Sequence, residues 1–494
     1  MTDTFDTIVA IATPPGRGAV GIVRVSGSDA LGVVNKIFHP FVQWESHRMY
    51  YGNIYNGPEV VDEVMACYMK APRSYTREDT VEIYAHGGMA TLYGVLDAVT
   101  SNGARLAQPG EFTKRAFLNG RINLTQAEAV MDLISAKSNA ARRAGLRQLG
   151  GGLSQRIIAS QDRILLWLAH IELSIDFPEH ESEAMNREAI LNDSHDWLAD
   201  MKALYKTSSL GRVLKEGIKT VIMGRPNVGK STLLNAIVNE DRAIVHELPG
   251  TTRDVLTEQV QLGDVVMQLM DTAGIRKTDD PVENIGVEKS YKAAQEAELI
   301  LYVCDYSKPP VPEDIEMLNK LIQKEQDPSG SFSAEEVLFQ VGVSEKAPES
   351  DSFINGVGKH VLVILNKCDL PTSDGWDVLQ TKISDASPHM VFRVSAQSHN
   401  GLETLYDAIQ QMFLKGLLGN DTEADIITSK RHKELLLCAI QGVQTAMDEF
   451  RAGVFEDLVS IGLKNAYSAL GELLGQEVSD DIIDRIFAEF CVGK

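Results

Sequence analysis

The sequence has little cysteine, no long apolar run and no basic N-terminal segment, and each shortage narrows the class of protein. Only five of the 494 residues are cysteine and none forms a Cys-x-x-Cys pair. This argues against a disulfide framework or a zinc site and favours a reducing compartment. No apolar run reaches the roughly 18 residues that a membrane-spanning helix needs. The N-terminal residues lack the basic and apolar regions of a signal peptide, so we expect a cytoplasmic protein without a membrane partner.

Basic residues are also scarce. The chain has 47 Lys and Arg against 69 Asp and Glu, which gives a formal net charge of −22. This charge disfavours nonspecific binding of nucleic acid by the whole surface, although it leaves room for a local basic face. Two basic clusters stand out, Arg142, Arg143, Arg147 and Arg156, and Lys430, Arg431, His432 and Lys433. We interpret both clusters as solvated helix faces.

The hydrophobic pattern divides the chain into four parts. Residues 1–120 mix short alternating runs with Gly and Pro, which is typical of an α+β domain. Residues 121–216 and 417–494 show apolar residues at helical spacing. Residues 217–416 contain the short apolar runs KTVIMG, VVMQLMD, LILYVCD, HVLVILN and HMVFRVS, separated by helix-like segments. Such runs are typical of a parallel sheet covered on both faces, so we predict an α/β domain inserted into a discontinuous helical domain.

Two local features refine this division. Thr125 and Glu128 predict a capping box at the start of the first long helical stretch. Residues 325–357 are rich in Ser, Glu, Asp, Pro and Gly, and we interpret them as a surface insertion without an assigned role.

Residues Gly224–Ser231, GRPNVGKS, follow a predicted strand and precede a predicted helix, which is the setting of a phosphate-binding P-loop. Glycines there let backbone N–H groups point at phosphate oxygens, and the helix N-terminus adds a favourable dipole. We expect Lys230 to reach the β- and γ-phosphates and Ser231 to bind Mg²⁺.

Four further motifs follow in order: PGTTRD at 249–254, DTAG at 271–274, NKCD at 366–369 and SAQ at 395–397. Thr252 and Asp271 are expected to complete the Mg²⁺ shell. The Asp369 carboxylate can accept both N–H groups of the amide edge of guanine, which predicts GTP rather than ATP. Because the motifs fall at strand ends, we predict a Ras-like P-loop G domain. The predicted GTP-binding residues are Asn227, Val228, Gly229, Lys230, Ser231, Thr232, His246, Glu247, Leu248, Pro249, Gly250, Thr251, Thr252, Asp271, Thr272, Ala273, Gly274, Asn366, Lys367, Asp369, Ser395, Ala396 and Gln397.

Ile275 follows DTAG, where Ras-like proteins often carry the glutamine that orients the attacking water. Two residues are candidates to supply what Ile275 does not. The Asn227 side chain could hold a monovalent cation beside the phosphates, or Asn227 could serve only as a turn former. Glu283 could orient water, or it could close a capping box with Asp280 and Pro281. The residue pattern leaves both alternatives open.

Together with the segments DTIVAIATPPGRGAVGIVRVSG, QPGEFTKRAFLNGRINLTQAEAVMDLI and the terminal FCVGK, these motifs resemble the tRNA modification GTPases called MnmE or TrmE. The resemblance covers almost the whole chain except the insertion. It implies an N-terminal domain that is similar to tetrahydrofolate-binding aminomethyltransferases and forms a homodimer. It also implies that GTP and K⁺ bring two G domains together and stimulate hydrolysis.

The resemblance further implies a partner and a reaction. With an FAD- and NADH-dependent flavoprotein of the GidA or MnmG type, in a heterotetramer, the family adds carboxymethylaminomethyl or aminomethyl groups. The acceptor is carbon 5 of the tRNA wobble uridine. The one-carbon unit comes from a tetrahydrofolate derivative, 5-formyl or methylene.

Residue roles are carried over from this resemblance position by position. Glu283 matches the catalytic glutamate that orients water. The remaining assignments are K⁺ ligands at Asn227, His246, Leu248 and Thr251, Mg²⁺ ligands at Ser231 and Thr252, and folate contacts at Arg24, Glu82, Arg121 and Lys494. His246 replaces a threonine of relatives, and Arg121 is lysine in some of them, which keeps the charge but changes its geometry. Cys491 matches a terminal cysteine, which we expect to be buried and structural rather than catalytic.

Two other classes compete with this interpretation. Ribosome-assembly GTPases share the apolar residue after DTAG and the P-loop asparagine, but they usually carry a basic RNA-binding domain, and this chain is acidic. Dynamin- or septin-like scaffolds also dimerise with nucleotide. The sequence shows neither coiled-coil heptads nor a basic membrane-binding helix, so we disfavour that class.

Overall fold

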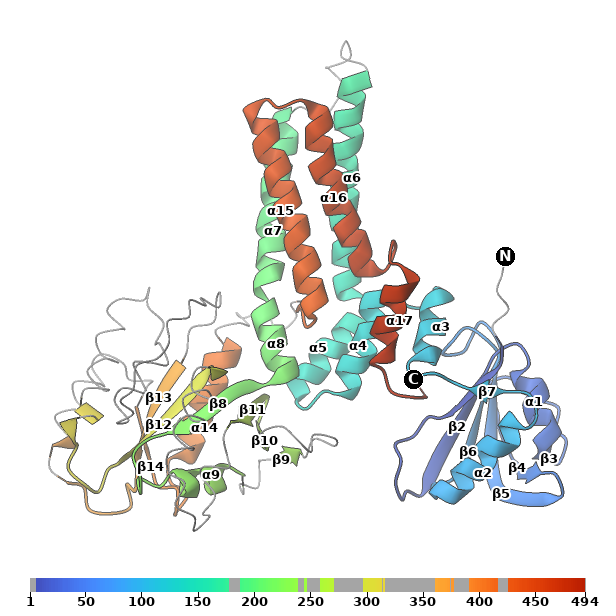
Figure 1. The fold of residues 1–494 in the computed structure, drawn as a ribbon, viewed down its shortest axis with the longest axis horizontal. Coiled ribbons are helices and arrows are strands. Elements are labelled where there is room, and N and C mark those ends of the chain that lie inside the picture. Colours follow the sequence, from blue (N-terminus) through green and yellow to red (C-terminus); the bar gives the residue numbers. More distant parts are fainter. Residues whose placement is uncertain are drawn as a thin grey trace. The chain divides into compact units, whose positions relative to one another are not determined.

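The computed structural model describes residues 6–176, 187–238, 244–246, 258–270, 296–312, 314–315, 360–373, 375–376, 391–415 and 425–493. The chain forms two compact units (Figure 1). The first comprises Met1–Ile134, Leu146–Ala199 and Glu434–Lys494, and the second comprises Ser135–Gly145 and Asp200–Lys433. Within the described ranges, no helix has the length and apolar character that crossing a membrane requires.

The first unit contains a seven-stranded sheet in the order β3-β4-β5-β6-β2-β1-β7. Its pairs are antiparallel except for β1 with β7. The strands are β1 (Ile8–Ile11), β2 (Val20–Ser26), β3 (Phe38–His39), β4 (Met49–Asn56), β5 (Glu59–Met69), β6 (Thr80–His86) and β7 (Arg105–Leu106). Alternate residues of β2 and β6, such as Val23, Val25, Val81 and Ile83, enter a core shared with α1 (Ala30–Ile37) and α2 (Met89–Thr100). The period of two therefore leaves Arg24 and Glu82 on the other face of the sheet.

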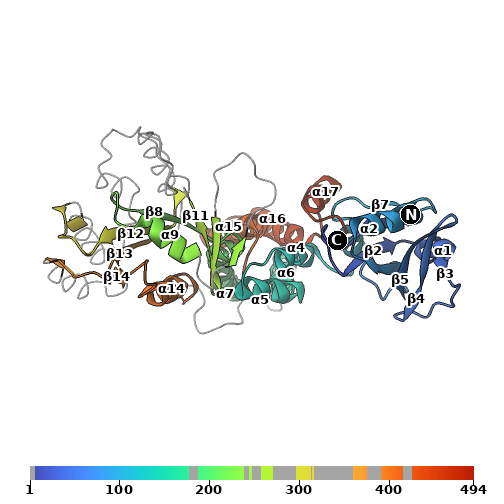
Figure 2. The ribbon, with the colours of Figure 1, turned by 90° about the horizontal axis from the view of Figure 1, so that it is seen from below.

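Helices make up the remainder of the first unit. They are α3 (Glu111–Leu118), α4 (Leu124–Ile134), the end of α5 (Asn139–Leu149), α6 (Gly152–Asp176), most of α7 (Arg187–Lys206), most of α15 (Lys430–Ala452), α16 (Glu456–Leu474) and α17 (Asp480–Ala488). Helices α6 and α16 lie side by side in both views (Figures 1 and 2). Trp167 of α6 meets Trp197 of α7 edge to face at 6.2 Å.

The predicted pairing of the two separated helical stretches is confirmed. Leu124 and Ala127 of α4 share a buried cluster with Ile483, Phe487 and Phe490 near the C-terminus. Neither stretch could bury these apolar stripes alone, so the helical domain combines segments from both sides of the inserted domain.

The predicted capping box at Thr125 and Glu128 is wrong by two residues. The Gln126 N–H donates to Asn123 Oδ1 at 3.0 Å, and the Asn123 N–H donates to Gln126 Oε1 at 3.0 Å. Asn123 is therefore the capping residue, and Thr125 lies in the first turn, where its hydroxyl donates to Asn123 Oδ1 at 2.7 Å. Asparagine accepts the N-terminal N–H groups as well as threonine does, so the helix can begin at either residue, and here it begins after Asn123.

The second unit contains a seven-stranded sheet in the order β14-β13-β12-β8-β11-β10-β9. Its strands are β8 (Ile218–Met223), β9 (Ile244–His246), β10 (Glu258–Leu262), β11 (Val265–Leu269), β12 (Leu299–Asp305), β13 (His360–Asn366) and β14 (Val391–Val394). The five predicted strands are present and parallel, as predicted. Strands β10 and β9 add an antiparallel edge that the sequence pattern did not indicate. The described helices around this sheet include α8 (Ser208–Glu216), α9 (Lys230–Val238) and α14 (Leu402–Gln410), which continues into a π-helical turn, η3 (Gln411–Lys415).

One basic cluster differs from the expectation of solvated helix faces. Arg142, Arg143 and Arg147 are exposed, as expected. His432 is completely buried near the start of α15, although the cluster in which it lies looks polar in sequence. A short basic run does not show which of its residues turns inward.

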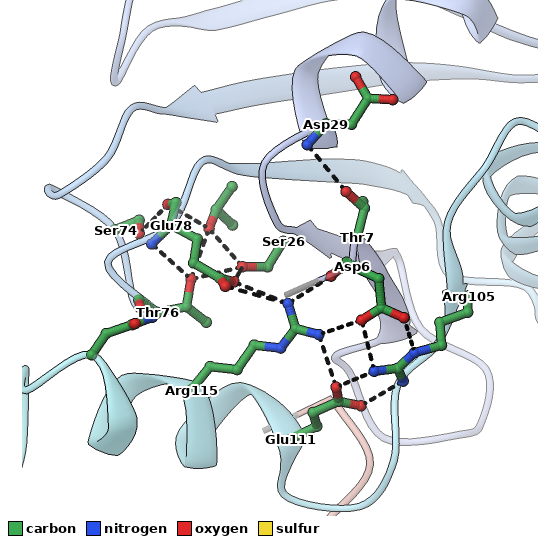
Figure 3. A network of polar contacts seen from close by, with 12 residues as sticks. Asp6, Thr7, Ser26, Asp29, Ser74, Thr76, Glu78, Arg105, Glu111 and Arg115 are labelled. Atoms are coloured by element: carbon green, nitrogen blue, oxygen red, sulfur yellow. Dashed lines mark hydrogen bonds and ion pairs between the residues drawn. The ribbon is translucent and has the colours of Figure 1, made fainter. Parts of the chain in front are cut away.

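A buried arginine organises the polar interior of the first unit (Figure 3). Arg115 of α3 has a side chain only 2% exposed and donates to the Asp6 carbonyl at 2.7 Å. It also pairs with Glu78 at 3.3 Å and with Glu111 at 2.9 Å. Glu78 in turn accepts from Ser26 Oγ at 2.8 Å. A buried guanidinium is stable only when it is neutralised and hydrogen-bonded in this way.

Two acidic partners of Arg115, Asp6 and Glu111, have lowered carboxyl pKa values. Hydrogen bonding by Arg105, together with the charges of Arg105 and Arg115, lowers the pKa of Asp6 despite its partial burial. Burial alone would raise the pKa of Glu111, but bonds from Arg105, the Gln108 N–H and Arg115 outweigh it and lower that pKa. Because both carboxyl pKa values are depressed in the folded state, their stabilising contribution is present at neutral pH. It is lost as the pH falls below about 4.

We predict that Arg115→Met destabilises the first unit by about 3–5 kcal/mol, because it leaves buried carboxylates without their cation. Arg105→Met is the matched control. Arg105 shares Asp6 and Glu111, but its side chain is 44% exposed, so a loss of about 0–1 kcal/mol is expected. Hydrogen exchange of the α3 amides at neutral pH measures both, and at pH below about 4 the difference between the wild type and Arg115→Met should shrink. Equal losses in the two variants would contradict a special role for Arg115.

Candidate functional site

The P-loop joins β8 to α9 and has the backbone of a phosphate cradle. Gly224 and Gly229 have φ values of 143° and 100°, and Asn227 has a φ of 64°. A Cβ atom at Gly224 would collide with the Val303 carbonyl oxygen, and one at Gly229 would collide with the Asn366 amide nitrogen. Both positions therefore require glycine. Helix α9 starts at Lys230, so its first N–H groups and its positive dipole end face the concave side of the loop.

Lys230 folds over the loop that precedes it. Its ammonium donates to the Gly224 carbonyl at 2.7 Å and to the Arg225 carbonyl at 2.8 Å. Burial lowers the pKa of Lys230, because the charged form loses water. A phosphate at the cradle would favour the charged form again. Ser231 and Thr232, the next two residues, are exposed on the first turn of α9.

Asn366 ties the P-loop to the two loops at the carboxyl ends of β13 and β14. Its side chain is buried. The amide Nδ2 donates to the Val228 carbonyl at 3.0 Å, and Oδ1 accepts from the Ala396 N–H at 3.0 Å. One amide group thus sets the separation between the GRPNVGKS and SAQ loops.

Lys367 links the loop after β13 to the P-loop and to the end of β12. Its ammonium donates to the Asn227 carbonyl at 3.0 Å and to Asp305 Oδ2 at 2.7 Å. Burial raises the pKa of Asp305, but the bonds from Lys367 and Ser307 outweigh it, so that pKa is lowered overall. Asp369 and Gln397 are exposed at the same edge of the sheet. The carboxylate of Asp369 is therefore free to meet a base that lies against this edge.

Asn227 has two properties that bear on the alternatives left open above. Its positive φ value is the conformation in which asparagine is enriched, as a turn former would be. Its side chain is nonetheless exposed beside the P-loop. The backbone role and a ligand role are therefore compatible, because they use different parts of the residue.

Several predicted residues lie outside the described part of the chain. They are Glu247, Leu248, Pro249, Gly250, Thr251, Thr252, Asp271, Thr272, Ala273, Gly274, Ile275, Glu283 and Lys494, together with the insertion 325–357. His246 ends β9, where its backbone lies opposite Gln259.

A second polar site lies on the sheet of the first unit. Arg24 of β2 stands directly opposite Glu82 of β6, and its Nε donates to Glu82 Oε1 at 2.9 Å. Arg24 Nη1 also donates to the Gly493 carbonyl at 3.1 Å, which fixes the C-terminal segment beside the pair. Gly493 has a φ of 92°, and a Cβ there would collide with the Ile11 carbonyl oxygen. The structure thus brings together Arg24 and Glu82 as the resemblance implies.

Two tyrosines in this site were not found from the sequence. Tyr84 donates from its hydroxyl to Glu82 Oε2 at 2.7 Å, and burial together with this bond raises the pKa of Tyr84. The ring of Tyr75 lies 5.4 Å from the Arg24 guanidinium and 4.7 Å from that of Arg121. Tyr84 could have been found, because it is two residues from Glu82 on the same strand face. Tyr75 lies in a loop, and no periodic signal marks it.

The expectation of a buried Cys491 is wrong, because its side chain is exposed. The backbone of this residue makes the structural contact instead, since the Gly110 N–H donates to the Cys491 carbonyl at 3.3 Å. The segment is therefore held by main-chain bonds and by Gly493, and it does not need an apolar side chain at 491.

We predict that Asn366→Ala weakens the G domain by about 2–3 kcal/mol, since the buried Val228 carbonyl and Ala396 N–H both lose their partner. GDP affinity should fall at least about tenfold as the loops lose their fixed separation. Asn235→Ala, at an exposed position on α9, is the control and should change neither quantity. Titration with fluorescent GDP and hydrogen exchange of β13 measure both effects. Unchanged GDP affinity in Asn366→Ala would show that the two hydrogen bonds of the Asn366 side chain do not position the loops.

Comparison with known proteins identifies the family of this chain. Two family models match, "GTP-binding protein TrmE N-terminus" over residues 7–121 and "MnmE helical domain" over residues 124–491. The curated protein "tRNA modification GTPase MnmE" of Thermoanaerobacter pseudethanolicus is 41% identical over 99% of this chain and 100% of its own length. Its namesake in Clostridioides difficile is 40% identical over 99% of each chain. Among solved structures, Aquifex aeolicus Era bound to GDP·AlF4⁻ has a TM-score of 0.24 and 21% identity over 45% of this chain and 65% of that one, a score too low to bear on function. On the full-length identity and the two matching models, the chain belongs to the MnmE family.

Proposed function

We propose that this protein hydrolyses GTP and that hydrolysis serves the modification of tRNA. The observation that carries the proposal is the Asn366 bridge, which holds a phosphate cradle and a base-reading edge at one fixed separation. Such a spacing is useful to a ligand that has phosphates at one end and a base at the other. The name of the two curated relatives, tRNA modification GTPase, supports both halves of the proposal. Their full-length match disfavours the ribosome-assembly alternative.

The residues divide the nucleotide between them. The P-loop amides and Lys230 would hold the β- and γ-phosphates, and the Asp369 carboxylate would read guanine beside the SAQ loop, residues 395–397. Ser231, Thr252 and Asp271 offer hydroxyl and carboxylate oxygens, which are the ligands that Mg²⁺ prefers. Ser231 is exposed at the start of α9 and directly follows Lys230 in the sequence, so its hydroxyl would be available to hold the metal.

We propose that a bound monovalent cation compensates for the absence of a glutamine at position 275, where this chain has isoleucine. The exposed side-chain oxygen of Asn227, with positions His246, Leu248 and Thr251, would bind K⁺ beside the phosphates. Its charge would take the place that an arginine finger occupies in related enzymes, a contribution of roughly 10³–10⁵ in rate. Glu283 would orient the attacking water as a hydrogen-bond acceptor.

The N-terminal site is proposed to bind a tetrahydrofolate derivative, 5-formyl or methylene, through Arg24, Glu82, Arg121 and Lys494. The described residues fit such a ligand. Arg24 and Tyr84 each occupy one oxygen of Glu82, and a carboxylate has lone pairs left to accept from the N–H groups of a heterocycle. The arginines supply positive charge for a glutamate tail. When bound, the folate supplies the one-carbon unit, and a flavoprotein of the GidA or MnmG type and a second copy of this chain complete the proposed assembly.

We expect GTP turnover to be fast in K⁺ and to fall steeply when Na⁺ replaces it at equal ionic strength. Na⁺ is smaller and fits a site built for K⁺ poorly, so part of the charge stabilisation is lost. Phosphate release measured with saturating GTP tests this. Asn227→Ala should lose the dependence on K⁺ while the wild type keeps it. Equal rates in the two salts would refute the proposed ion.

We expect Glu283→Ala to bind GTP normally but to lose hydrolysis, and to fail to restore modified wobble uridines in cells lacking this protein. Asp280→Ala is the matched control, because it removes the other half of a capping box and leaves the Glu283 carboxylate in place. If Glu283 is catalytic, Glu283→Ala is inactive and Asp280→Ala keeps activity. If Glu283 only caps a helix, both variants lose about 1 kcal/mol of stability and behave alike in activity. Mass spectrometry of wobble uridines, with the wild-type chain as the positive control, provides the readout.

A further inference from the structure

Tyr75 connects two side chains that the proposed function assigns to one ligand. The guanidinium of Arg24 lies over its ring at 5.4 Å from the centroid, and that of Arg121 lies at 4.7 Å. Arg121 Nη1 also donates to the Tyr75 carbonyl at 3.0 Å. Two like charges beside one another repel, and the negative face of an aromatic ring offsets part of that repulsion.

The loop that carries Tyr75 is fixed on both sides. Its hydroxyl hydrogen-bonds to Thr113 Oγ1 of α3 at 2.9 Å. The next residue, Thr76, is completely buried, and its hydroxyl lies 2.7 Å from Ser26 Oγ. Asn119 Nδ2 donates to the Thr76 carbonyl at 2.7 Å. This part of the loop thus belongs to the network around Arg115 and Glu78 (Figure 3).

The two arginines sit in different surroundings, and this determines how much each needs the ring. The Arg24 side chain is only 14% exposed and already bonds to Glu82 and to the Gly493 carbonyl. Arg121 is exposed. A cation–π contact is stronger where water is excluded, and an exposed arginine samples many rotamers unless a contact selects one. The ring therefore strengthens the contacts of Arg24 and orders Arg121.

We propose that Tyr75 is a positioning residue of the N-terminal site, which holds the Arg24 and Arg121 guanidinium groups in the geometry that receives an anionic, aromatic ligand of the folate class. This inference rests on the proposed folate site. Tyr75 acts on the ligand only by positioning the two arginines.

The test is titration of the full-length chain with 5-formyltetrahydrofolate, followed by calorimetry. Tyr75→Leu should weaken binding on the order of 10-fold or more, because Arg121 loses its ring contact and Arg24 keeps only its contact with the Phe112 ring. Tyr75→Phe keeps the ring and should bind within about threefold of the wild type. Tyr93→Leu, at a tyrosine that is 53% exposed on α2, is the matched control and should leave binding unchanged.

A double-mutant cycle separates positioning from simple support of the fold. If Tyr75 acts through Arg121, the losses caused by Tyr75→Leu and Arg121→Met are not additive, whereas independent structural damage adds. Circular dichroism melts of each variant identify any that fail to fold, and Tyr75→Trp then replaces Tyr75→Leu. Tryptophan is the strongest cation–π partner, so it should bind at least as well as phenylalanine if the ring is what matters.

The remaining outcomes each overturn a different statement. If Arg24→Ala and Glu82→Ala weaken binding but Tyr75→Leu does not, Tyr75 has no positioning role and the proposed site stands. If Tyr75→Phe binds as poorly as Tyr75→Leu, the bond to Thr113 rather than the ring is responsible, and the inference is wrong. If none of the variants changes binding, or the wild type does not bind, the folate site itself is refuted.

Discussion

The nucleotide site depends on one buried amide. The Asn366 amide nitrogen donates to the Val228 carbonyl, and its amide oxygen accepts from the Ala396 N–H. A single rigid group therefore joins three loops. If either bond were absent, a buried polar group would lack its partner at a cost of about 1–3 kcal/mol. The loops consequently hold their separation before a ligand arrives. Binding energy is then not used to order them, which is the physical meaning of a preorganised site.

The N-terminal site follows the same principle with charges instead of an amide. Arg115 is buried and lies among Asp6, Glu78 and Glu111, and through Ser26 and Thr76 this network fixes the loop that carries Tyr75. Arg115 thereby supports residues of the proposed folate site. In both units, then, a buried polar group sets the position of side chains that point outward. Ion pairs and hydrogen bonds to its neighbours offset the cost of burying it and also make its position specific.

The positions of some residues could be predicted from the sequence and those of others could not, and the difference has a physical reason. The P-loop was predictable because its glycines are imposed by local backbone geometry, and the parallel strands because they are apolar throughout. Burial depends on contacts distant in sequence, and there the predictions failed or were absent. His432 is buried within a basic run, Cys491 is exposed at an apolar-looking terminus, and nothing local marks Arg115 as an interior residue. The pairing of Arg24 with Glu82 spans 58 positions and was not predicted, since the family resemblance assigned both residues to one ligand but not to each other.

The described contacts also limit where catalysis can originate. The Asn366 bridge fixes the guanine-reading edge relative to the P-loop, and the interactions of the base change little as the terminal phosphate departs. Interactions that are equal in the ground state and the transition state improve binding but do not accelerate the chemical step. Ile275 has no polar group to contribute there. A rate enhancement therefore needs charge at the γ-phosphate, from Lys230 and from a further group outside this rigid frame. A cation recruited beside Asn227 would satisfy that requirement without any change in the frame that holds the nucleotide.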